Sequence, residues 1–178
     1  MTNPQERYRQ QLAQWSDIRR HLPVLREHAR GNVLELGTRD GVSTIALLAG
    51  VDAHGGHVWS VDIDDCSHLF PDEPNWTFIQ ADSLDVPTIV FDGGVPDELD
   101  LLFVDTLHHY EQVWRELDTW GHAVKPGGWI LIHDTQLSQG AWHAVDTWAA
   151  ENGYVATFRT GSNGLGMIQI PEEDEPNE

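Results

Sequence analysis

The feature that most constrains this fold is the alternation of short apolar segments with helical segments along most of the chain. The apolar segments predict strands at residues 32–36, 57–61, 76–80, 99–104, 129–132, 155–159 and 166–170. Apolar residues at helical spacing predict helices at residues 42–49, 110–124 and 142–152, and a longer one at residues 6–29 that bends near Pro23. Strands that alternate with helices favour an α/β fold, in which helices cover both faces of a mostly parallel sheet.

The same pattern divides the chain into one domain and two ends. Residues 31–170 carry the alternating segments and form the predicted domain. Residues 1–30 form a predicted helical segment, and residues 171–178 a predicted disordered acidic tail. A chain of 178 residues with 40% hydrophobic residues suffices for one buried core.

The sequence also indicates where such a protein resides. No apolar run approaches the roughly 20 residues that cross a membrane, and the polar N-terminus lacks the apolar stretch of a signal peptide. Cys66 is the only cysteine, so no internal disulfide can form. We therefore expect a cytoplasmic protein with no membrane partner.

Charge excludes one class of partner and marks the N-terminal segment. The formal net charge is -19, from 29 acidic and 10 basic residues, which disfavours nucleic-acid binding. Six of those basic residues lie in the first thirty: Arg7, Arg9, Arg19, Arg20, Arg26 and Arg30. One interpretation is that this segment docks on an acidic surface, either of its own chain or of a partner in a homo-oligomer. The alternative is a solvated amphipathic helix.

A glycine-containing turn follows the strand at residues 32–36. Its sequence, Glu35-Leu-Gly-Thr-Arg-Asp-Gly41, lets the backbone approach a ligand closely at each glycine. It lacks the tighter G-x-G-x-x-G spacing that suits a pyrophosphate. S-adenosylmethionine carries no phosphate, so a wider turn that follows an acidic residue suits this cofactor better. The alternative is an ordinary strand-to-helix turn.

Acidic residues near the ends of three consecutive strands strengthen the cofactor interpretation. Glu35 stands at the end of the first strand, Asp62 follows the second, and Asp82 follows the third. The carboxyl ends of parallel strands meet at one edge of the sheet, where ligands bind. There Asp62 can accept hydrogen bonds from both ribose hydroxyls, and Asp82 from the exocyclic amine of adenine.

A second group of polar residues follows two later strands. Residues 105–111 read Asp-Thr-Leu-His-His-Tyr-Glu, and residues 133–135 read His-Asp-Thr. Asp and His at such positions suit a divalent ion or a general base for a hydroxyl. Asp105, His108 and His133 are the predicted catalytic residues, and Asp105, His133 and Asp134 the predicted metal ligands. The alternative for His108 and His133 is a structural role, with hydrogen bonds to loop backbone.

These segments resemble the class I S-adenosylmethionine-dependent methyltransferases. Within them the chain is similar to sugar O-methyltransferases of the macrocin type and to proteins related to cephalosporin hydroxylase. The matching segments are VLELGTRDGVST, VWSVDIDD, FIQADSLD, LDLLFVDTLHHYEQVWRELDTWGHAVKPGGWILIHDT and NGLGMI. The resemblance implies a Rossmann-like, doubly wound sheet of seven strands, mostly parallel with an antiparallel last strand.

The resemblance also implies roles for individual residues. It places Glu35, Gly37 and Gly41 around the methionine part of the cofactor, with Asp62 at the ribose and Asp82 at the adenine. The family motif Asp-x-x-His-x-Tyr-Glu is present as Asp105, His108, Tyr110 and Glu111. Metal-binding relatives carry paired acids after the fifth strand. Here the pair is His133 and Asp134, a departure from the oxygen ligands that Mg²⁺ prefers.

We therefore expect an S-adenosylmethionine-dependent methyltransferase that methylates an oxygen of a small hydroxylated acceptor, such as a sugar or a phenol-like compound. The expected cofactors are S-adenosylmethionine and a divalent metal, Mg or Mn. The predicted cofactor site comprises Glu35, Gly37, Thr38, Gly41, Ser43, Asp62, Asp82 and Ser83. Two alternatives stay open: a hydroxylase-like or other reaction on the same scaffold, and a non-catalytic module that binds S-adenosylmethionine.

Overall fold

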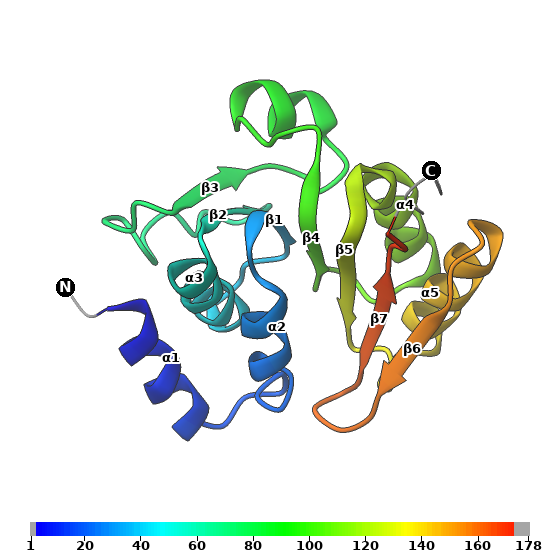
Figure 1. Ribbon diagram of the computed structural model, residues 1–178, viewed down its shortest axis with the longest axis horizontal. Helices are drawn as coiled ribbons and strands as arrows, with labels where there is room; N and C mark the ends of the chain where they lie inside the picture. The colour runs from blue at the N-terminus through cyan, green and yellow to red at the C-terminus, as the bar shows by residue number, and fades with distance from the viewer. Residues whose placement is uncertain (1–2, 173–178) are drawn as a thin grey trace, which may run out of the picture.

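A seven-stranded sheet forms the centre of the computed structural model, which describes residues 3–172 (Figure 1). The strands are β1 (Gly31–Leu36), β2 (Gly56–Asp62), β3 (Trp76–Gln80), β4 (Leu99–Val104), β5 (Val124–His133), β6 (Ala156–Arg159) and β7 (Leu165–Gln169). From residue 173 onward, the predicted acidic tail lies outside the described residues.

The strand order is β3-β2-β1-β4-β5-β7-β6. β1 to β5 pair in parallel, whereas β7 runs antiparallel to both β5 and β6. The mostly parallel sheet with an antiparallel last strand is thus confirmed. From β1 the next strands along the chain are added toward one edge of the sheet, and from β4 onward they are added toward the other edge. A crevice is therefore expected between β1 and β4, at the carboxyl ends of these two strands.

The helices form one layer on each face of the sheet (Figure 1). They are α1 (Pro4–Ala13), α2 (Leu22–His28), α3 (Val42–His54), α4 (Tyr110–Trp120) and α5 (Gln139–Glu151), with a π-helical turn η1 (Thr88–Asp92) and a 3₁₀ turn η2 (Gly121–Ala123). On β4, Leu101 and Phe103 pack with α1, α2 and α3, whereas Leu102 and Val104 pack with α4 and α5. This alternation follows from the two-residue period of a strand that is buried on both faces.

The single bent helix predicted for residues 6–29 is wrong, because the structure has two helices with a loop between them. Asn3 caps α1 by accepting a hydrogen bond from the backbone N–H of Gln5, and α1 ends at Ala13. Pro23 lies in the first turn of α2. Proline is favoured there because its missing N–H would have no partner in the helix, so it begins a helix here and bends none.

The N-terminal segment docks on its own chain. The Gln5 amide donates to the Ala49 carbonyl at 2.7 Å and to Asp52 at 2.9 Å, both on α3, and Tyr8 is buried. The Arg26 guanidinium lies over the Tyr8 ring, 5.4 Å from its centroid. Within residues 3–172, none of the six N-terminal arginines forms an ion pair. The contact therefore rests on packing and hydrogen bonds, and no ion pair of these arginines contributes to it.

Other boundaries shift for local reasons. β5 begins at Val124, five residues before the predicted start of this strand at residue 129. α5 begins at Gln139, three residues before the predicted start, because the Ser138 side chain caps it by accepting from the N–H of Ala141.

Among residues 3–172, no helix combines the length and the apolar character that crossing a membrane requires.

Candidate functional site

Two adjoining cavities open at the carboxyl ends of the strands. The first, of about 340 Å³, is here named the His108 cavity. It is lined by Trp15, Ser16, Asp17, Ile18, Gly37, Thr38, Arg39, Asp40, Val42, Ser43, Asp105, Thr106, His108 and Asp134. The second, of about 350 Å³, is the Asp62 cavity. It is lined by Gly37, Arg39, Val61, Asp62, Ile63, Asp64, Ala81, Asp82, Ser83, Asp105, Thr106, Leu107 and Gln112. The two cavities share Gly37, Arg39, Asp105 and Thr106, so one elongated ligand can extend across both.

The glycine turn after β1 lies against the backbone that follows β4. Gly37 has a φ of +91°, and a Cβ there would overlap the backbone carbonyl of Asp105. Gly41, with a φ of +72°, precedes the first residue of α3. Only glycine adopts this backbone without strain, so the close approach of the two strand ends requires Gly37.

Glu35 lies beneath this turn. It is fully buried, and its carboxylate accepts hydrogen bonds from the hydroxyls of Ser43, Thr44 and Ser60 at 2.5–2.8 Å. Burial raises the pKa of Glu35 to about 7, although these three hydroxyls oppose the shift. Glu35 and Gly41 line neither cavity, and their predicted contact with a cofactor stays a prediction. The observed role of Glu35 is to join the start of α3 to β1 and β2.

Two aspartates, Asp62 at the end of β2 and Asp82 after β3, present oxygens to the Asp62 cavity. One Asp62 oxygen accepts from the backbone N–H groups of Thr38 and Arg39, at 2.8 and 2.9 Å. Its other oxygen accepts from the N–H of Asp64 at 3.0 Å. Asp82 accepts from the N–H of Leu84 at 2.9 Å. Backbone groups thus hold both carboxylates in place, and each oxygen keeps lone-pair capacity for a ligand hydroxyl or amine.

The remaining lining of the Asp62 cavity is largely apolar. Ile63 follows β2 and Leu107 follows β4, and they are 70% and 65% exposed, high values for large apolar side chains. Val61 and Ala81 add further apolar surface. A cavity with apolar walls and a few fixed acceptors suits a flat, polar-edged ring such as a nucleobase.

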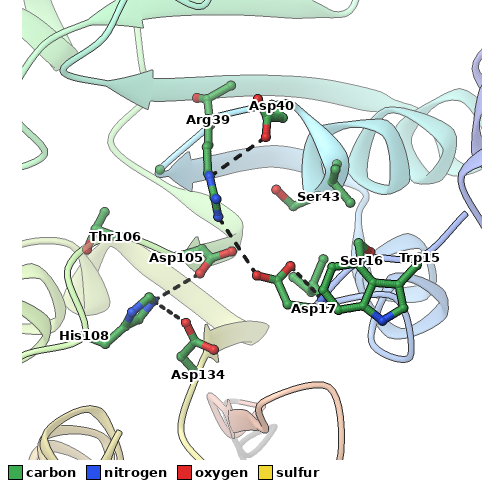
Figure 2. Close-up of a pocket in the computed structure, with 14 residues that line it drawn as sticks. Trp15, Ser16, Asp17, Arg39, Asp40, Ser43, Asp105, Thr106, His108 and Asp134 are labelled. Atoms are coloured by element: carbon green, nitrogen blue, oxygen red, sulfur yellow. Dashed lines mark hydrogen bonds and ion pairs between the residues drawn. The ribbon is translucent and has the colours of Figure 1, made fainter. Parts of the chain in front are cut away.

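Three polar side chains converge in the His108 cavity (Figure 2). His108 Nε2 lies 3.3 Å from Asp105 Oδ1 and 2.9 Å from Asp134 Oδ2. Burial lowers the pKa of His108, but the hydrogen bonds and negative charges of the two aspartates outweigh burial and raise it to about 9. At Asp105 and Asp134 burial raises the pKa, but hydrogen bonds to the imidazoles and the positive charges of His108 and His133 outweigh it and hold the pKa of each below its usual range.

Asp134 has two unusual features. Its backbone φ is +62°, in the left-handed region that residues other than glycine seldom adopt. Its Oδ1 atom is buried and has no hydrogen-bond partner among residues 3–172, and His133 Nδ1 lies 3.5 Å away. Strained backbone and an unpaired buried oxygen cluster at functional sites, because the fold holds them there for a ligand. With Asp105 and His108, Asp134 forms a set of donor atoms that all lie within 4.8 Å of one another and could hold a metal ion.

His133 lies behind this cluster and lines neither cavity. Its Nδ1 is 3.1 Å from Asp105 Oδ1, and its Nε2 is 2.9 Å from the backbone carbonyl of Ser162. A ligand role for His133 would require the loss of one of these bonds. The structure therefore groups Asp105 and Asp134 with His108, where the sequence predicted a set completed by His133.

The predicted cofactor residues divide between the cavities. Gly37, Thr38 and Ser43 line the His108 cavity, and Gly37 is joined by Asp62, Asp82 and Ser83 in the Asp62 cavity. Asp105 and His108, both predicted to be catalytic, line the His108 cavity.

The loop between α1 and α2 also lines the site, which the sequence did not predict. Trp15 to Ile18 line the His108 cavity, and the Trp15 side chain is 86% exposed at its mouth (Figure 2). Arg39 Nη1 lies 4.0 Å from Asp17 Oδ2 in this loop, and Arg39 Nε lies 3.9 Å from Asp40 Oδ2. Arg39 thus connects the loop to the glycine turn. No local sequence signal links residues so distant from Asp105 along the chain.

Comparison with known proteins identifies a matching family and solved structures of the same fold. The family described as a methyltransferase domain matches residues 34–135. Among solved structures, a protein of Corynebacterium glutamicum has 15% identity over 99% of this chain and 93% of its own, with a TM-score of 0.74. The O-methyltransferase NovP has 17% identity over 86% of this chain and 81% of its own, with a TM-score of 0.68. MycE, a methyltransferase of the mycinamycin biosynthetic pathway solved with Mg, SAH and mycinamycin VI, has 20% identity over 89% of this chain and 50% of its own, with a TM-score of 0.64.

Proposed function

Because this chain belongs to the methyltransferase domain family, we propose that it transfers a methyl group from S-adenosylmethionine to a hydroxyl of a small acceptor. One observation carries the proposal. A cavity suited to a nucleoside adjoins, through Gly37 and Asp105, a cavity that holds two carboxylates and an imidazole. NovP, whose fold this chain shares, is an O-methyltransferase, and MycE was solved with SAH.

The residues of the Asp62 cavity fit the adenosine part of this cofactor. Asp62 would accept from the ribose hydroxyls and Asp82 from the adenine amine, with Ile63 and Leu107 against the ring. The methionine part would extend past Gly37 into the His108 cavity, where Thr38 and Ser43 supply polar contacts. When bound, S-adenosylmethionine supplies an electrophilic methyl group. The protein supplies orientation and a partly enclosed site, which favour in-line transfer.

The acceptor hydroxyl also needs help to lose its proton, and Asp105, His108 and Asp134 are placed to provide it. The unpaired, buried Oδ1 of Asp134 fits a cation, as does the convergence of a second carboxylate and an imidazole. A bound divalent ion would supply Lewis-acid activation of the hydroxyl. MycE was solved with Mg. The alternative assigns His108 as general base, oriented by both aspartates. Because the pKa of His108 is about 9, the imidazole can accept a proton only as the pH rises toward that value.

The acceptor itself would lie between this cluster and the loop between α1 and α2. Trp15 offers a flat apolar surface at the mouth of the His108 cavity, and Asp17 and Asp40 offer hydrogen-bond acceptors. This combination suits a small hydroxylated ring, either sugar or phenol-like. A cytoplasmic location, and a homo-oligomer formed through the N-terminal segment, stay predictions of the sequence.

Calorimetry with S-adenosylmethionine tests the cofactor assignment. Asp62→Ala should weaken binding by roughly 1.5–3 kcal/mol, the scale of a charge-assisted hydrogen bond. Asp72→Ala, which removes an exposed acid that lines neither cavity, should leave the affinity unchanged. Formation of S-adenosylhomocysteine with a panel of sugars and phenols then tests transfer. Binding without turnover on any acceptor would favour a non-catalytic module, and no binding would refute the proposal.

A further inference from the structure

A buried hydrogen-bond network lies directly behind the Asp62 cavity. Its centre is Glu116 on α4, whose side chain is fully buried. Glu116 accepts from Ser83 Oγ at 2.5 Å, from Thr106 Oγ1 at 2.7 and 2.9 Å, and from Gln112 Nε2 at 2.9 Å. All three donors line the Asp62 cavity, whereas Glu116 does not. One buried carboxylate therefore holds three residues of the cavity wall.

This network determines which way the Gln112 amide points. Gln112 and Glu116 are four residues apart on α4, so they share one face of the helix. Gln112 Nε2 also donates to Ser83 Oγ at 3.1 Å. A carboxylate accepts hydrogen bonds and donates none, so the NH₂ group must face Glu116. Within residues 3–172, Gln112 Oε1 has no hydrogen-bond partner and is the amide atom left for a ligand.

We propose that Gln112 reads the 6-amino group of the cofactor's adenine through Oε1, and that Glu116 is the positioning residue that fixes this orientation. The inference rests on the proposed function, because it takes adenine as the ligand of the Asp62 cavity. An exocyclic amine has two N–H donors, and Asp82 and Gln112 line the same cavity as two acceptors. A 6-oxo purine carries an acceptor at this position, so it would oppose Gln112 Oε1.

Binding of two matched ligands tests the proposal. The probes are S-adenosylhomocysteine and its 6-oxo counterpart, S-inosylhomocysteine, each titrated into the full chain by calorimetry. The wild type should bind S-adenosylhomocysteine at least about tenfold more tightly than S-inosylhomocysteine. Gln112→Leu keeps the bulk of the side chain and removes its polar atoms. It should lower the ratio of the two affinities, adenine compound over 6-oxo compound, about tenfold.

Glu116→Gln tests the positioning role separately. A glutamine at this position can donate to Gln112 Oε1, which frees the Gln112 amide to turn its NH₂ group into the cavity. The preference for the adenine compound should then fall by about tenfold or reverse, while both ligands still bind. Asp118→Asn, which changes an exposed acid on the same helix and outside both cavities, should leave the ratio at its wild-type value.

The outcomes separate this inference from the proposed function. If the wild type binds neither compound, the cofactor assignment fails and the inference fails with it. If S-adenosylhomocysteine binds but Gln112→Leu leaves the ratio unchanged, the inference alone is overturned. If both ligands weaken equally in Gln112→Leu and Glu116→Gln, the network supports the fold and does not read the base. A changed ratio in Gln112→Leu alone would keep Gln112 as the reader and overturn the role of Glu116.

Discussion

Gly37 lies so close to Asp105 that a Cβ on Gly37 would overlap the Asp105 carbonyl oxygen. This approach joins the ends of β1 and β4, where the strand order reverses, and it forms a boundary shared by the two cavities. Asp105, whose carboxylate we propose to be catalytic, is therefore held beside the turn proposed to contact the cofactor.

Replacement of Gly37 should damage both stability and cofactor binding. Gly37→Ala adds backbone strain at a φ of +91° and a clash with Asp105, so we expect a loss of about 2–4 kcal/mol in the free energy of unfolding. Denaturant titration measures this loss. Gly153→Ala is the control, because Gly153 has a φ of +75° but open space around its Cβ position, and should lose only about 1 kcal/mol. Equal losses would mean that the close approach to Asp105 carries no energetic weight.

Glu35 should make the stability of the protein depend on pH. Its folded-state pKa of about 7 lies above its value of 4.5 when exposed, so the folded state holds the proton more tightly. As pH rises from about 4.5 to 8, this group therefore destabilises the fold by up to about 3 kcal/mol. Glu35→Gln cannot ionise, so the stability of the wild type relative to this variant should fall over that range.

Denaturant titrations at several pH values measure the difference between wild type and Glu35→Gln. The exposed Glu27→Gln serves as the matched control. If the difference in the free energy of unfolding between wild type and Glu35→Gln stays constant from pH 4.5 to pH 8, the raised pKa of Glu35 is refuted.

The proposed metal site predicts binding that is measurable without any acceptor. Calorimetry with Mn²⁺ should detect one site, and Asp134→Asn should lower its affinity at least tenfold by removing a ligand charge. Asp97→Asn, an exposed substitution outside both cavities, should not change it. A chelator should abolish methyl transfer, and added Mg²⁺ or Mn²⁺ should restore it.

The alternative role of His108 as general base predicts a different pattern. Chelator would then have no effect, and His108→Ala would lose roughly 10²–10⁴ in rate. Under the metal mechanism, His108→Ala keeps partial turnover because Asp105 and Asp134 still hold the ion. Full activity in both Asp105→Ala and His108→Ala would exclude both mechanisms.

Trp15 should affect the acceptor and not the cofactor. Because its side chain is 86% exposed, Trp15→Ala should leave the melting temperature within about 2 °C of the wild type. The KM for the acceptor should rise about tenfold, while affinity for S-adenosylmethionine stays the same. Phe91→Ala is the matched control, since Phe91 is 82% exposed and lines neither cavity. An unchanged KM in Trp15→Ala would remove the loop from the acceptor site.

The strands and the edge that carries the site could be predicted because their signals are local. Residues 101–104 are all apolar, which indicates a strand buried on both faces, and β4 is such a strand. Asp62, Asp82 and Asp105 each follow a predicted strand closely, and parallel pairing brings such positions to one edge. The sequence alone therefore determined the fold class and nine of the 23 residues that line the two cavities.

Which histidine joins Asp105 and Asp134 in the cluster, His108 or His133, depended on the tertiary structure. His133 ends β5 two residues after Leu131, so its side chain points to the same sheet face, where the His21 ring lies 6.0 Å away. His108 instead reaches the cluster from the loop after β4, because the left-handed backbone of Asp134 turns a carboxylate toward it. Neither the backbone angle nor the loop path is encoded in residue spacing.

Contacts across long stretches of chain were likewise decided only by folding. The loop of residues 14–18 joins the site because α1 packs on α3, and the buried Glu116 joins it because α4 packs against the sheet beside Ser83. A local pattern reports which face of a helix is apolar and where a strand ends. It does not report which distant side chain will meet that face, because such a meeting depends on the packing of the whole core.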